Sequence, residues 1–402
     1  QKKVIELRNR NILVSAAAGS GKTAVLVERI LSMVTDERRP VDIDKLLIVT
    51  FTKAAAGEMK ERIRDALDKR LEEDPEDEYL QRQLTLLNNA QITTIDSFCQ
   101  YVLKSYFHVI DVDPGYRVGE EGELKLLKKD VAQELLEEAY SSQDGEFAHC
   151  VECYATGKND RELEDLILKL HEFSMSYPWP LKWYGECEKA YEIRSLEELD
   201  RAEWMKLLVK NVNSLLEDAR EQTEEALRLC LQEDGPYMYE EALLSDKKMI
   251  EGLLECRSYL EYASAFKNAG KFARLSAKRD VNVSDEAKEQ VKNMREQVKK
   301  TVSAIMEQYF YDSPDQLLTD MQSSAPAVRE LLRLAGEFSK RYAEKKRDKN
   351  LVDFGDMEHF ALQILVEEKD GEIVQRDAAR ELAERYEEIL IDEYQDSNLV
   401  QE

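Results

Sequence analysis

The hydrophobic and polar positions along the chain follow two different periods. In residues 1–117, short apolar runs alternate with segments of helical spacing, and this alternation returns in residues 350–402. The continuous apolar run 46–49 is typical of a strand that is covered on both faces, and the apolar run 389–391 predicts a further strand. Strands that alternate with helices predict a parallel sheet in an α/β domain, whose ligands bind at the carboxyl ends of the strands. The same reasoning predicts a third strand at 92–94 and helices at 54–71, 97–107, 354–365 and 374–386.

Residues 118–349 follow the helical period alone. This stretch is rich in charged residues and contains no convincing strand. The pattern predicts a large all-helical domain inserted into the α/β domain. We therefore expect residues 1–117 to form the first segment of the α/β domain, 118–349 the inserted helical domain, and 350–402 the second segment, which ends shortly after the strand at 389–391.

The net charge of −26 argues against a general affinity for nucleic acids. The charge is unevenly distributed, because residues 1–117 carry a net charge of −1, whereas 118–349 carry −13 and 350–402 carry −12. A nearly neutral segment can still present a local phosphate-binding face. Bulk electrostatic attraction is therefore excluded as the way in which this protein finds DNA.

Cysteine usage and the absence of targeting segments suggest a reducing compartment. Six cysteines show no disulfide framework, and Cys150 and Cys153 form a lone C-x2-C pair beside His149. We interpret the cysteines as reduced thiols, with metal binding as the alternative. Neither a signal peptide nor a run of membrane-spanning length is recognisable, which predicts a cytoplasmic protein without membrane contact. Because the chain begins at Gln1 rather than at a methionine, we expect it to be part of a longer protein.

Residues 16–23 are the most informative stretch of the sequence. The apolar run 12–14, which predicts a strand, precedes them, and the amphipathic run 25–31, which predicts a helix, follows them. A loop between a strand and a helix is the context of a phosphate-binding loop, which here has alanine in place of the usual first glycine. The candidate nucleotide-binding residues are Ala16, Ala17, Ala18, Gly19, Ser20, Gly21, Lys22 and Thr23.

The residue types in this loop suit the binding of a phosphate chain. Gly19 and Gly21 allow backbone conformations in which successive N–H groups point at one phosphate chain. Lys22 would reach the β- and γ-phosphates, and Thr23 would bind Mg²⁺ through its hydroxyl. An ordinary glycine turn with a surface lysine is the alternative.

Asp392 and Glu393 directly follow the apolar run 389–391. Together with a phosphate loop, Asp392 would hold Mg²⁺, directly or through water, opposite Thr23. Glu393 would orient and deprotonate the attacking water, because hydrolysis of a γ-phosphate needs a base in line with the leaving oxygen. Two solvated carboxylates are the alternative. The assignment predicts that the side chains of Thr23 and Asp392 lie within about 8 Å, close enough to share one cation.

Two further features each allow two interpretations. The side-chain amide of Gln1 could pair with both edges of an adenine, but from the residues alone a frayed polar end is the simpler interpretation. The aromatic cluster in residues 177–184 could stack on bases. We favour a structural role for it, in which the cluster holds a loop against a core.

The chain resembles, along its whole length, the superfamily 1 helicases of the UvrD/Rep group, which share five motifs in the same order. The motifs are Gln1-x-x-Val4-Ile5, Ala16 to Thr23, Thr50-Phe51-Thr52-Lys53-Ala54-Ala55-Ala56-Gly57-Glu58-Met59, Thr93-Thr94-Ile95-Asp96-Ser97-Phe98-Cys99 and Ile391-Asp392-Glu393-Tyr394-Gln395-Asp396-Ser397-Asn398. Within the group, residues 15–23, residues 95–99 and the helical insertion with Tyr177-Pro178-Trp179-Pro180 are similar to the AddA branch of helicase–nuclease subunits, which is related to RecB.

The resemblance implies a RecA-like P-loop NTPase domain, with a parallel sheet incomplete at its C-terminal end, and ATP and Mg²⁺ as cofactors. It implies that Gln1 contacts adenine and that Gln395 acts with Lys22 and Glu393 in catalysis by coupling the γ-phosphate to the DNA site. The residues that it places on the single-strand track are Phe51, Thr52, Lys53, Thr94 and Ser97. Many relatives have Asn-Lys at Lys53-Ala54 and a histidine at Asp96, so Lys53 would carry the phosphate contact alone.

Two classes of function are compatible with these motifs. The first is a motor, the ATP-binding part of a DNA helicase that moves on single strands and contacts duplex or a partner through its helical insertion. The second is a non-motor P-loop repair ATPase or a DNA-end-binding module. The resemblance implies a nuclease domain, opposing arginines from a second RecA-like domain, and a partner of the AddB type. We therefore expect the 402 residues alone to hydrolyse ATP slowly and not to unwind duplex.

Overall fold

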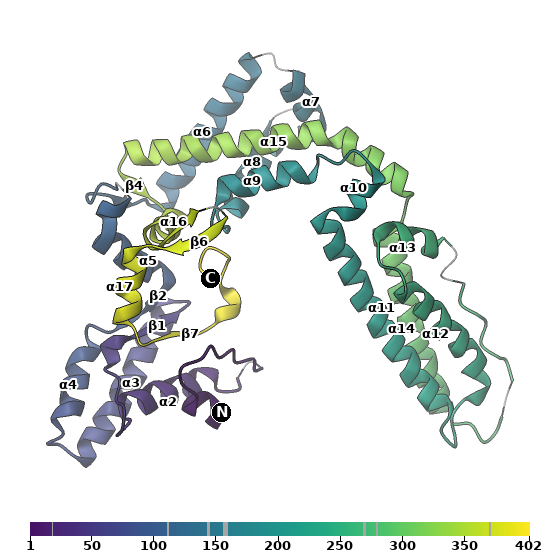
Figure 1. The fold of residues 1–402 in the computed structure, drawn as a ribbon, viewed down its shortest axis with the longest axis horizontal. Helices are drawn as coiled ribbons and strands as arrows, with labels where there is room; N and C mark the ends of the chain where they lie inside the picture. Colours follow the sequence, from purple (N-terminus) through teal and green to yellow (C-terminus); the bar gives the residue numbers. More distant parts are fainter. Residues whose placement is uncertain are drawn as a thin grey trace. The chain divides into compact units, whose positions relative to one another are not determined.

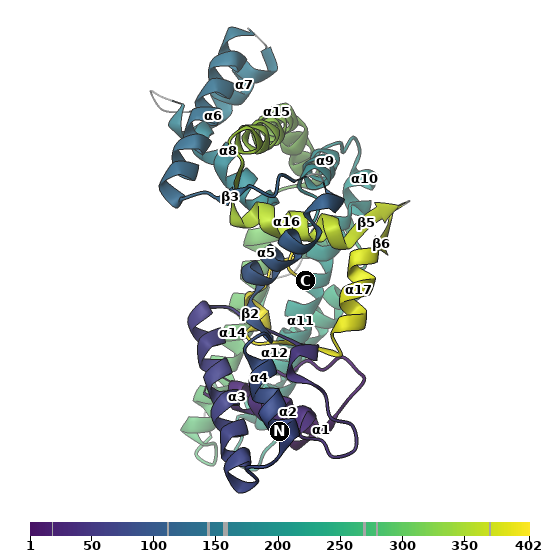
Figure 2. The ribbon, with the colours of Figure 1, turned by 90° about the vertical axis from the view of Figure 1, so that its left-hand side faces the viewer.

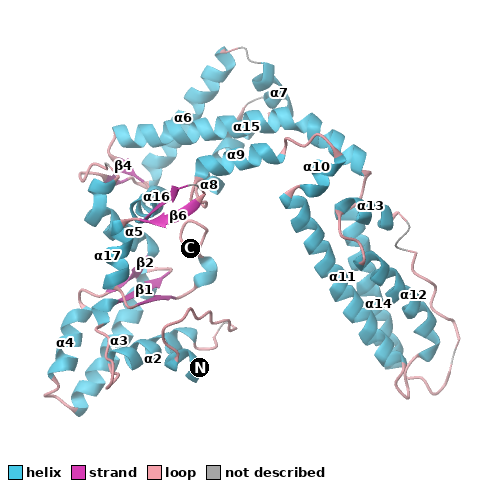
Figure 3. Ribbon diagram, viewed as in Figure 1, coloured by secondary structure: helices cyan, strands magenta, loops and turns pink. Residues whose placement is uncertain are grey.

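The computed structural model describes residues 1–17, 19–110, 112–142, 145–155, 160–267, 271–278, 280–369 and 371–402. The fold is mixed α/β, consists mostly of helices and contains small sheets (Figures 1 and 3). The chain divides into two compact units. One comprises Gln1–Asp144, Tyr154–Tyr184 and Leu332–Glu402, and the other comprises Gly145–Cys153 and Gly185–Leu331.

A three-stranded parallel sheet lies in the first unit, with the strand order β2-β1-β7. Its strands are β1 (Leu46–Thr50), β2 (Gln91–Thr94) and β7 (Glu388–Ile391). Every residue of β1 is buried, as its continuous apolar run predicts. Thr50 pairs with Thr94 and Val49 pairs with Ile391, so the carboxyl ends of the three strands meet at one edge. The predicted parallel sheet is confirmed.

Helices cover both faces of this sheet (Figures 1 and 2). Leu46 and Ile48 of β1 pack into one core with α2 (Lys22–Val34), α3 (Lys53–Glu73) and α4 (Glu78–Leu87). The alternate residues Leu47 and Val49 pack into a second core. This second core also contains residues of α5 (Ile95–Tyr106), α16 (Phe354–Leu365) and α17 (Asp377–Arg385). The side chains of one strand thus alternate between two apolar layers, which explains its unbroken hydrophobic run.

Two predicted elements differ from the structure. Residues 12–14 form no strand, and the side chain of Leu13 is 80% exposed, because no described strand lies beside them to supply hydrogen bonds. The helix expected from residue 374 begins at Asp377, since residues 372–375 instead form β6 (Glu372–Gln375), which pairs with β5 (Val366–Lys369) in an antiparallel hairpin.

The described residues between Glu121 and Asp348 form helices and one 3-10 turn but no strand, as their helical period predicts. The helices are α6 (Glu121–Ser141), α7 (Gly145–Tyr154), α8 (Arg161–Ser174), α9 (Pro180–Ala190), α10 (Leu196–Arg201), α11 (Glu203–Cys230), α12 (Glu240–Leu254), α13 (Tyr259–Phe266), α14 (Asp285–Tyr309) and α15 (Pro314–Asp348). The described residues also form the helix α1 (Lys2–Glu6), the short strand pair β3 (Arg117–Val118) and β4 (Leu351–Val352), and 3-10 turns at Ile43–Lys45, Phe107–Val109 and Tyr394–Asp396. None of the described helices is long and apolar enough to cross a membrane.

The aromatic cluster holds a loop against α16, as favoured above. Tyr177 and Trp183 stack with ring centroids 5.5 Å apart, and the buried Tyr184 hydroxyl lies 3.0 Å from the Ser174 hydroxyl. A ring nitrogen of His359, on α16, lies 2.9 Å from the Tyr177 carbonyl oxygen. In these contacts the aromatic rings of Tyr177 and Trp183 pack on each other, and the loop backbone binds α16.

A buried ion cluster joins α15 to the start of α16. The ammonium of Lys346 lies 2.6 Å from Oδ2 of Asp353 and 2.6 Å from Oδ2 of Asp356. Asp353 also caps α16 as predicted, because its carboxylate accepts from the Asp356 backbone N–H at 2.9 Å. Burial alone would raise the pKa of Asp353, but the charge and hydrogen bond of Lys346 outweigh it and hold that pKa below its ordinary value.

The buried His171 should make the folding stability of the first unit sensitive to acid. Its Nδ1 lies 2.9 Å from the Ser339 hydroxyl, and burial, reinforced by the charges of Lys128 and Lys346, lowers its pKa to about 3. The opposing charge of Asp353 is the smaller effect. The unfolded chain takes up a proton on this histidine near pH 6.5, whereas the folded chain takes it up only near pH 3. The free energy of unfolding therefore falls as the pH drops from about 6.5 to about 3, by up to about 1.4 kcal/mol per pH unit.

We expect a His171→Asn variant, which keeps a hydrogen-bonding side chain but cannot titrate, to lose stability less steeply between about pH 6.5 and pH 5 than the wild type. Denaturant unfolding at a series of pH values measures this slope. Parallel slopes for the two proteins would contradict the assignment to His171.

Candidate functional site

The loop before α2 adopts the backbone conformation that its glycines predict. Gly19 and Gly21 have φ angles of 75° and 82°, and a Cβ added at either position would meet nothing within 4 Å. Gly21 is the N-cap of α2, and Lys22 is its first residue. Four backbone N–H groups at a helix start lack partners within the helix, so this loop suits an anion.

The other loop residues lie around this helix start. The ammonium of Lys22 lies 3.5 Å from the Ala16 carbonyl oxygen, and the Ser20 backbone N–H donates to the Ala17 carbonyl at 3.2 Å. Ala16, Ala17 and Ser20 are exposed. Ala18, which the sequence also predicts to bind nucleotide, lies outside the described residues.

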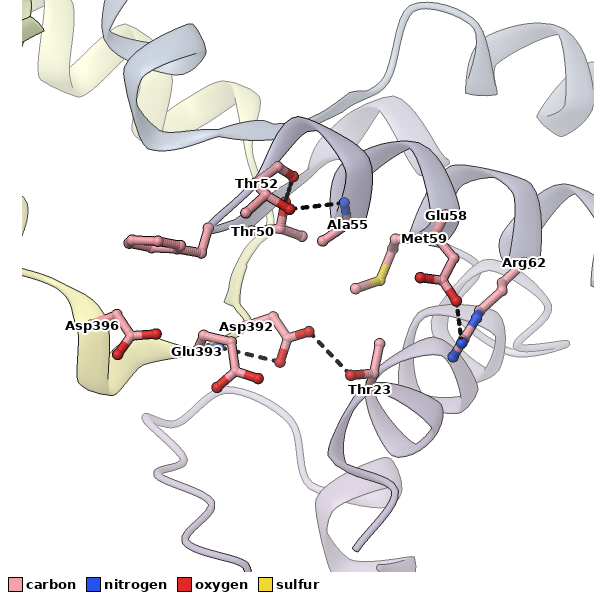
Figure 4. Close-up of a pocket in the computed structure, with 11 residues that line it drawn as sticks. Thr23, Thr50, Thr52, Ala55, Glu58, Met59, Arg62, Asp392, Glu393 and Asp396 are labelled. Carbon is pink, nitrogen blue, oxygen red and sulfur yellow. Dashed lines mark hydrogen bonds and ion pairs between the residues drawn. The ribbon is translucent and has the colours of Figure 1, made fainter. Parts of the chain in front are cut away.

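Thr23 and Asp392 meet although 369 positions separate them. The Thr23 hydroxyl donates to Oδ2 of Asp392 at 3.2 Å (Figure 4). The sheet explains this proximity, since the Asp392 backbone N–H donates to the Val49 carbonyl at 2.9 Å and continues the pairing of β7 with β1. The predicted proximity of the two side chains is confirmed.

Glu393 lies at a turn between β7 and a 3-10 turn, Tyr394–Asp396. Its φ of 57° is in the left-handed region, which costs a glutamate roughly 1–3 kcal/mol and persists only where surrounding structure holds it. The side-chain amide of Gln395 donates to the Glu393 carboxylate. The turn thus orients a carboxylate that neither helix nor strand geometry would place there.

A cavity of about 370 Å³ lies at this edge of the sheet (Figure 4). Its lining residues are Thr23, Thr50, Phe51, Thr52, Ala55, Glu58, Met59, Arg62, Asp392, Glu393 and Asp396. The described Gln1, Lys22 and Gln395 are not among them. Threonine hydroxyls and carboxylates line the same space, and such oxygen-rich donors are those that Mg²⁺ prefers. The loop N–H groups suit phosphate.

The sequence reasoning missed the contribution of α3 to this cavity. The cavity is lined by Ala55, Glu58, Met59 and Arg62, and steps of three and four residues connect them (55 to 58 and 59, and 58 and 59 to 62), which places their side chains on one helix face. The guanidinium of Arg62 pairs with Glu58 at this face. This spacing was readable in the sequence, but it did not reveal which face of α3 lies toward Thr23.

The residues assigned to single-stranded DNA lie where β1 and β2 end. Phe51 is 63% exposed, whereas Thr94 is buried and its hydroxyl donates to the Ser97 hydroxyl at 3.0 Å. Thr52 and Thr94 each cap the helix that follows, through the N–H groups of Ala55 and Ser97. Both threonines therefore have a structural role besides any contact with DNA.

Lys53 and Asp96 influence each other at the same edge. Burial raises the pKa of Asp96, and the positive charge of Lys53 opposes that rise. Lys53 is exposed as the first residue of α3. It is thus a cation at the end of β1, close enough to Asp96 to interact electrostatically.

Gln1 lies apart from this cavity, at the N-terminal end of α1. Its backbone carbonyl accepts from Val4 at 2.9 Å, and its side chain is exposed and makes no capping hydrogen bond. The amide is therefore available to a ligand.

Comparison with known proteins relates the whole chain to one family. Residues 1–402 match the UvrD/REP helicase N-terminal domain. Similar curated proteins are named as the A subunit of an ATP-dependent helicase/nuclease. The one from Lachnoclostridium phytofermentans is 49% identical over 100% of this chain and 30% of its own length. The one from Clostridium beijerinckii is 44% identical over 100% of this chain and 32% of its own length. Another occurs in Acetivibrio thermocellus, at 40% over 98% and 32%. The chain thus spans about a third of the length of these relatives, and its match over residues 1–402 shows that it belongs to the UvrD/REP helicase family.

Proposed function

We propose that this chain is the ATP-binding part of an ATP-dependent DNA helicase, a helicase–nuclease subunit that translocates on single-stranded DNA in double-strand break repair and recombination. The contact between Thr23 and Asp392 is the main support for the proposal. It joins the end of a phosphate loop to a carboxylate that directly follows β7, at the carboxyl end of a parallel sheet. The family match and the names of the relatives support the DNA and helicase parts.

In this function Mg·ATP supplies the phosphoanhydride bond whose hydrolysis drives movement. Lys22 and backbone N–H groups of the loop at residues 16–23 would hold its phosphates, and Thr23 and Asp392 would hold the cation. Glu393 orients a water molecule and takes its proton. Gln395, whose amide contacts Glu393, couples the γ-phosphate to the DNA site, and Gln1 pairs with adenine.

The single strand binds along the ends of β1 and β2. Phe51 stacks on bases, Lys53 contacts phosphate, and Thr52, Thr94 and Ser97 complete the track. Residues 1–117 and 350–402 form one RecA-like domain whose parallel sheet is incomplete at its C-terminal end, and residues 118–349 form a helical insertion that contacts duplex DNA. A protein of the AddB type is the proposed partner of the full-length protein, and the cytoplasm is the proposed location.

Stimulation of ATPase activity by single-stranded DNA tests this proposal against a non-motor repair ATPase or an end-binding module. We expect the full-length protein to hydrolyse ATP faster when single strands are added, and to move along them. ATP hydrolysis that responds only to duplex ends, without movement along single strands, would favour the non-motor alternative.

Phe51 provides a variant that separates DNA binding from nucleotide binding. Stacking on one aromatic side chain contributes about 1–3 kcal/mol per base, so we expect Phe51→Ala to weaken single-strand binding by roughly 10- to 100-fold. ATP affinity without DNA should change far less, although Phe51 also lines the cavity beside Thr23. Fluorescence anisotropy with a labelled oligonucleotide measures the first effect. Phe354→Ala is the matched control, since Phe354 is similarly exposed but lies at the start of α16. If both variants bound the single-stranded oligonucleotide with equal affinity, Phe51 would not be a DNA contact.

A further inference from the structure

Polar contacts hold the helix that follows Gln1, whose apolar residues Val4 and Ile5 are only half-buried. None of the five residues of α1, all of them described, is buried. The guanidinium of Arg29, on α2, donates instead to the carbonyl oxygens of Val4 and Leu7 at the C-terminal end of α1, the latter at 2.7 Å. Carbonyls at a helix end have no partners within the helix, so one side chain satisfies two of them.

The same guanidinium reaches the strand that leads to Asp392. Nε of Arg29 donates to Oε1 of Glu388, the first residue of β7, at 2.5 Å, and the Arg29 side chain is only 5% exposed. Arg29 lies six residues after Thr23 on α2. One buried residue therefore joins the three elements that carry Gln1, the phosphate loop and Asp392.

We propose that Arg29 is a positioning residue that sets the place of Gln1 relative to the phosphate loop, and thereby the preference for adenine over guanine nucleotides. The inference rests on the proposed pairing of Gln1 with adenine. An amide distinguishes the two bases only while its donor and acceptor stay within hydrogen-bonding distance and angle of the base edge. Arg8 also donates to the Ile5 and Leu7 carbonyls and to the Ser32 hydroxyl on α2, so it shares this placement. Arg29 is the buried residue of the two and the one that also reaches β7.

Arginine is needed here because its planar fork presents several donors in fixed directions, whereas lysine presents one compact ammonium. Arg29→Met keeps most of the side-chain volume but removes all three contacts. Arg29→Lys keeps a positive charge opposite Glu388 without reaching both carbonyls of α1. The lysine variant keeps the test informative if the methionine variant folds poorly.

The test compares the affinities of the full-length protein for ATP and GTP by calorimetry. We expect Gln1→Ala and Arg29→Met each to reduce the ratio of ATP to GTP affinity about tenfold, the effect of one or two lost hydrogen bonds, and Arg29→Lys to reduce it less. The double variant Gln1→Ala with Arg29→Met should lose nothing further, since both changes remove the same interaction.

Arg295→Met is the matched control. Arg295 is 4% exposed, pairs with Asp246 at 2.6 Å and donates to the Ala273 carbonyl at 2.6 Å in the other compact unit, so its loss should destabilise the protein while the affinity ratio stays that of the wild type. The inference is overturned if both Arg29 variants also keep the wild-type ratio while Gln1→Ala lowers it. If Gln1→Ala itself leaves the ratio unchanged, the proposed adenine contact and this inference fail together.

Discussion

Lys22→Ala is expected to reduce ATP turnover at saturating single-stranded DNA by at least about 10²–10³-fold. This is the usual effect of removing one group that stabilises charge in a transition state. Lys22 begins α2 directly after a loop whose glycines have positive φ angles, and nothing fills the space beside them. The variant should also bind Mg·ATP more weakly, which calorimetry measures.

The fold should tolerate this change. The ammonium of Lys22 lies 3.5 Å from the Ala16 carbonyl, at the limit of a hydrogen bond, so its removal costs little stability. Lys69→Ala, at an exposed position of α3, is the control for the loss of one positive charge. Unchanged melting together with wild-type nucleotide affinity in Lys22→Ala would refute the phosphate-loop assignment.

Replacing Lys346 with methionine is expected to lower the free energy of unfolding by about 3–5 kcal/mol, because the change leaves two buried carboxylates without their cation. The Lys346 ammonium lies 2.6 Å from both Asp353 and Asp356 and 4.2 Å from the ring centroid of Tyr342. Burial also raises the pKa of Asp356, and the charge of Lys346 opposes that rise. Denaturant unfolding of the chain measures the loss.

Lys345 offers a control at the neighbouring position. Its ammonium pairs with Glu134 at 3.0 Å, but both side chains are about half exposed, so Lys345→Met should change stability by no more than about 1 kcal/mol. Adding Asp353→Asn and Asp356→Asn to Lys346→Met should restore part of the loss, since asparagine keeps the helix cap and removes the buried charge. If Lys346→Met and Lys345→Met unfolded at the same denaturant concentration, the cluster would have no special role in stability.

Much of the α/β part was predictable because its signals are local. The all-apolar run of β1 predicts a buried strand, and Asp353 predicts the start of α16, since a carboxylate can cap the helix that follows it. The apolar run at 12–14 gave a false signal. A strand requires a partner as well as suitable residues, and no described strand lies beside Leu13.

The residues around the candidate site also divide into those that local sequence predicts and those that only the packing of distant segments brings together. The spacing of Gly19, Gly21, Lys22 and Thr23 indicates a phosphate loop without any knowledge of the rest of the chain, because glycine conformations and helix starts depend on neighbouring residues. The contact of Thr23 with Asp392 across 369 positions was expected only from the assumption that both belong to one site. The pairing of β7 with β1 is what brings them together.

Arg29 and the face of α3 that contains Arg62 could be recognised only in the folded protein. In the sequence, Arg29 is one charged residue in an amphipathic helix, where a solvent-exposed position is the usual expectation. Its burial depends on Glu388 and on two carbonyls of α1, which come from distant parts of the chain. Local residue patterns determine loops, caps and strand runs, whereas partners of buried charges depend on how distant segments pack, since a charge is buried only where the tertiary structure supplies its partner.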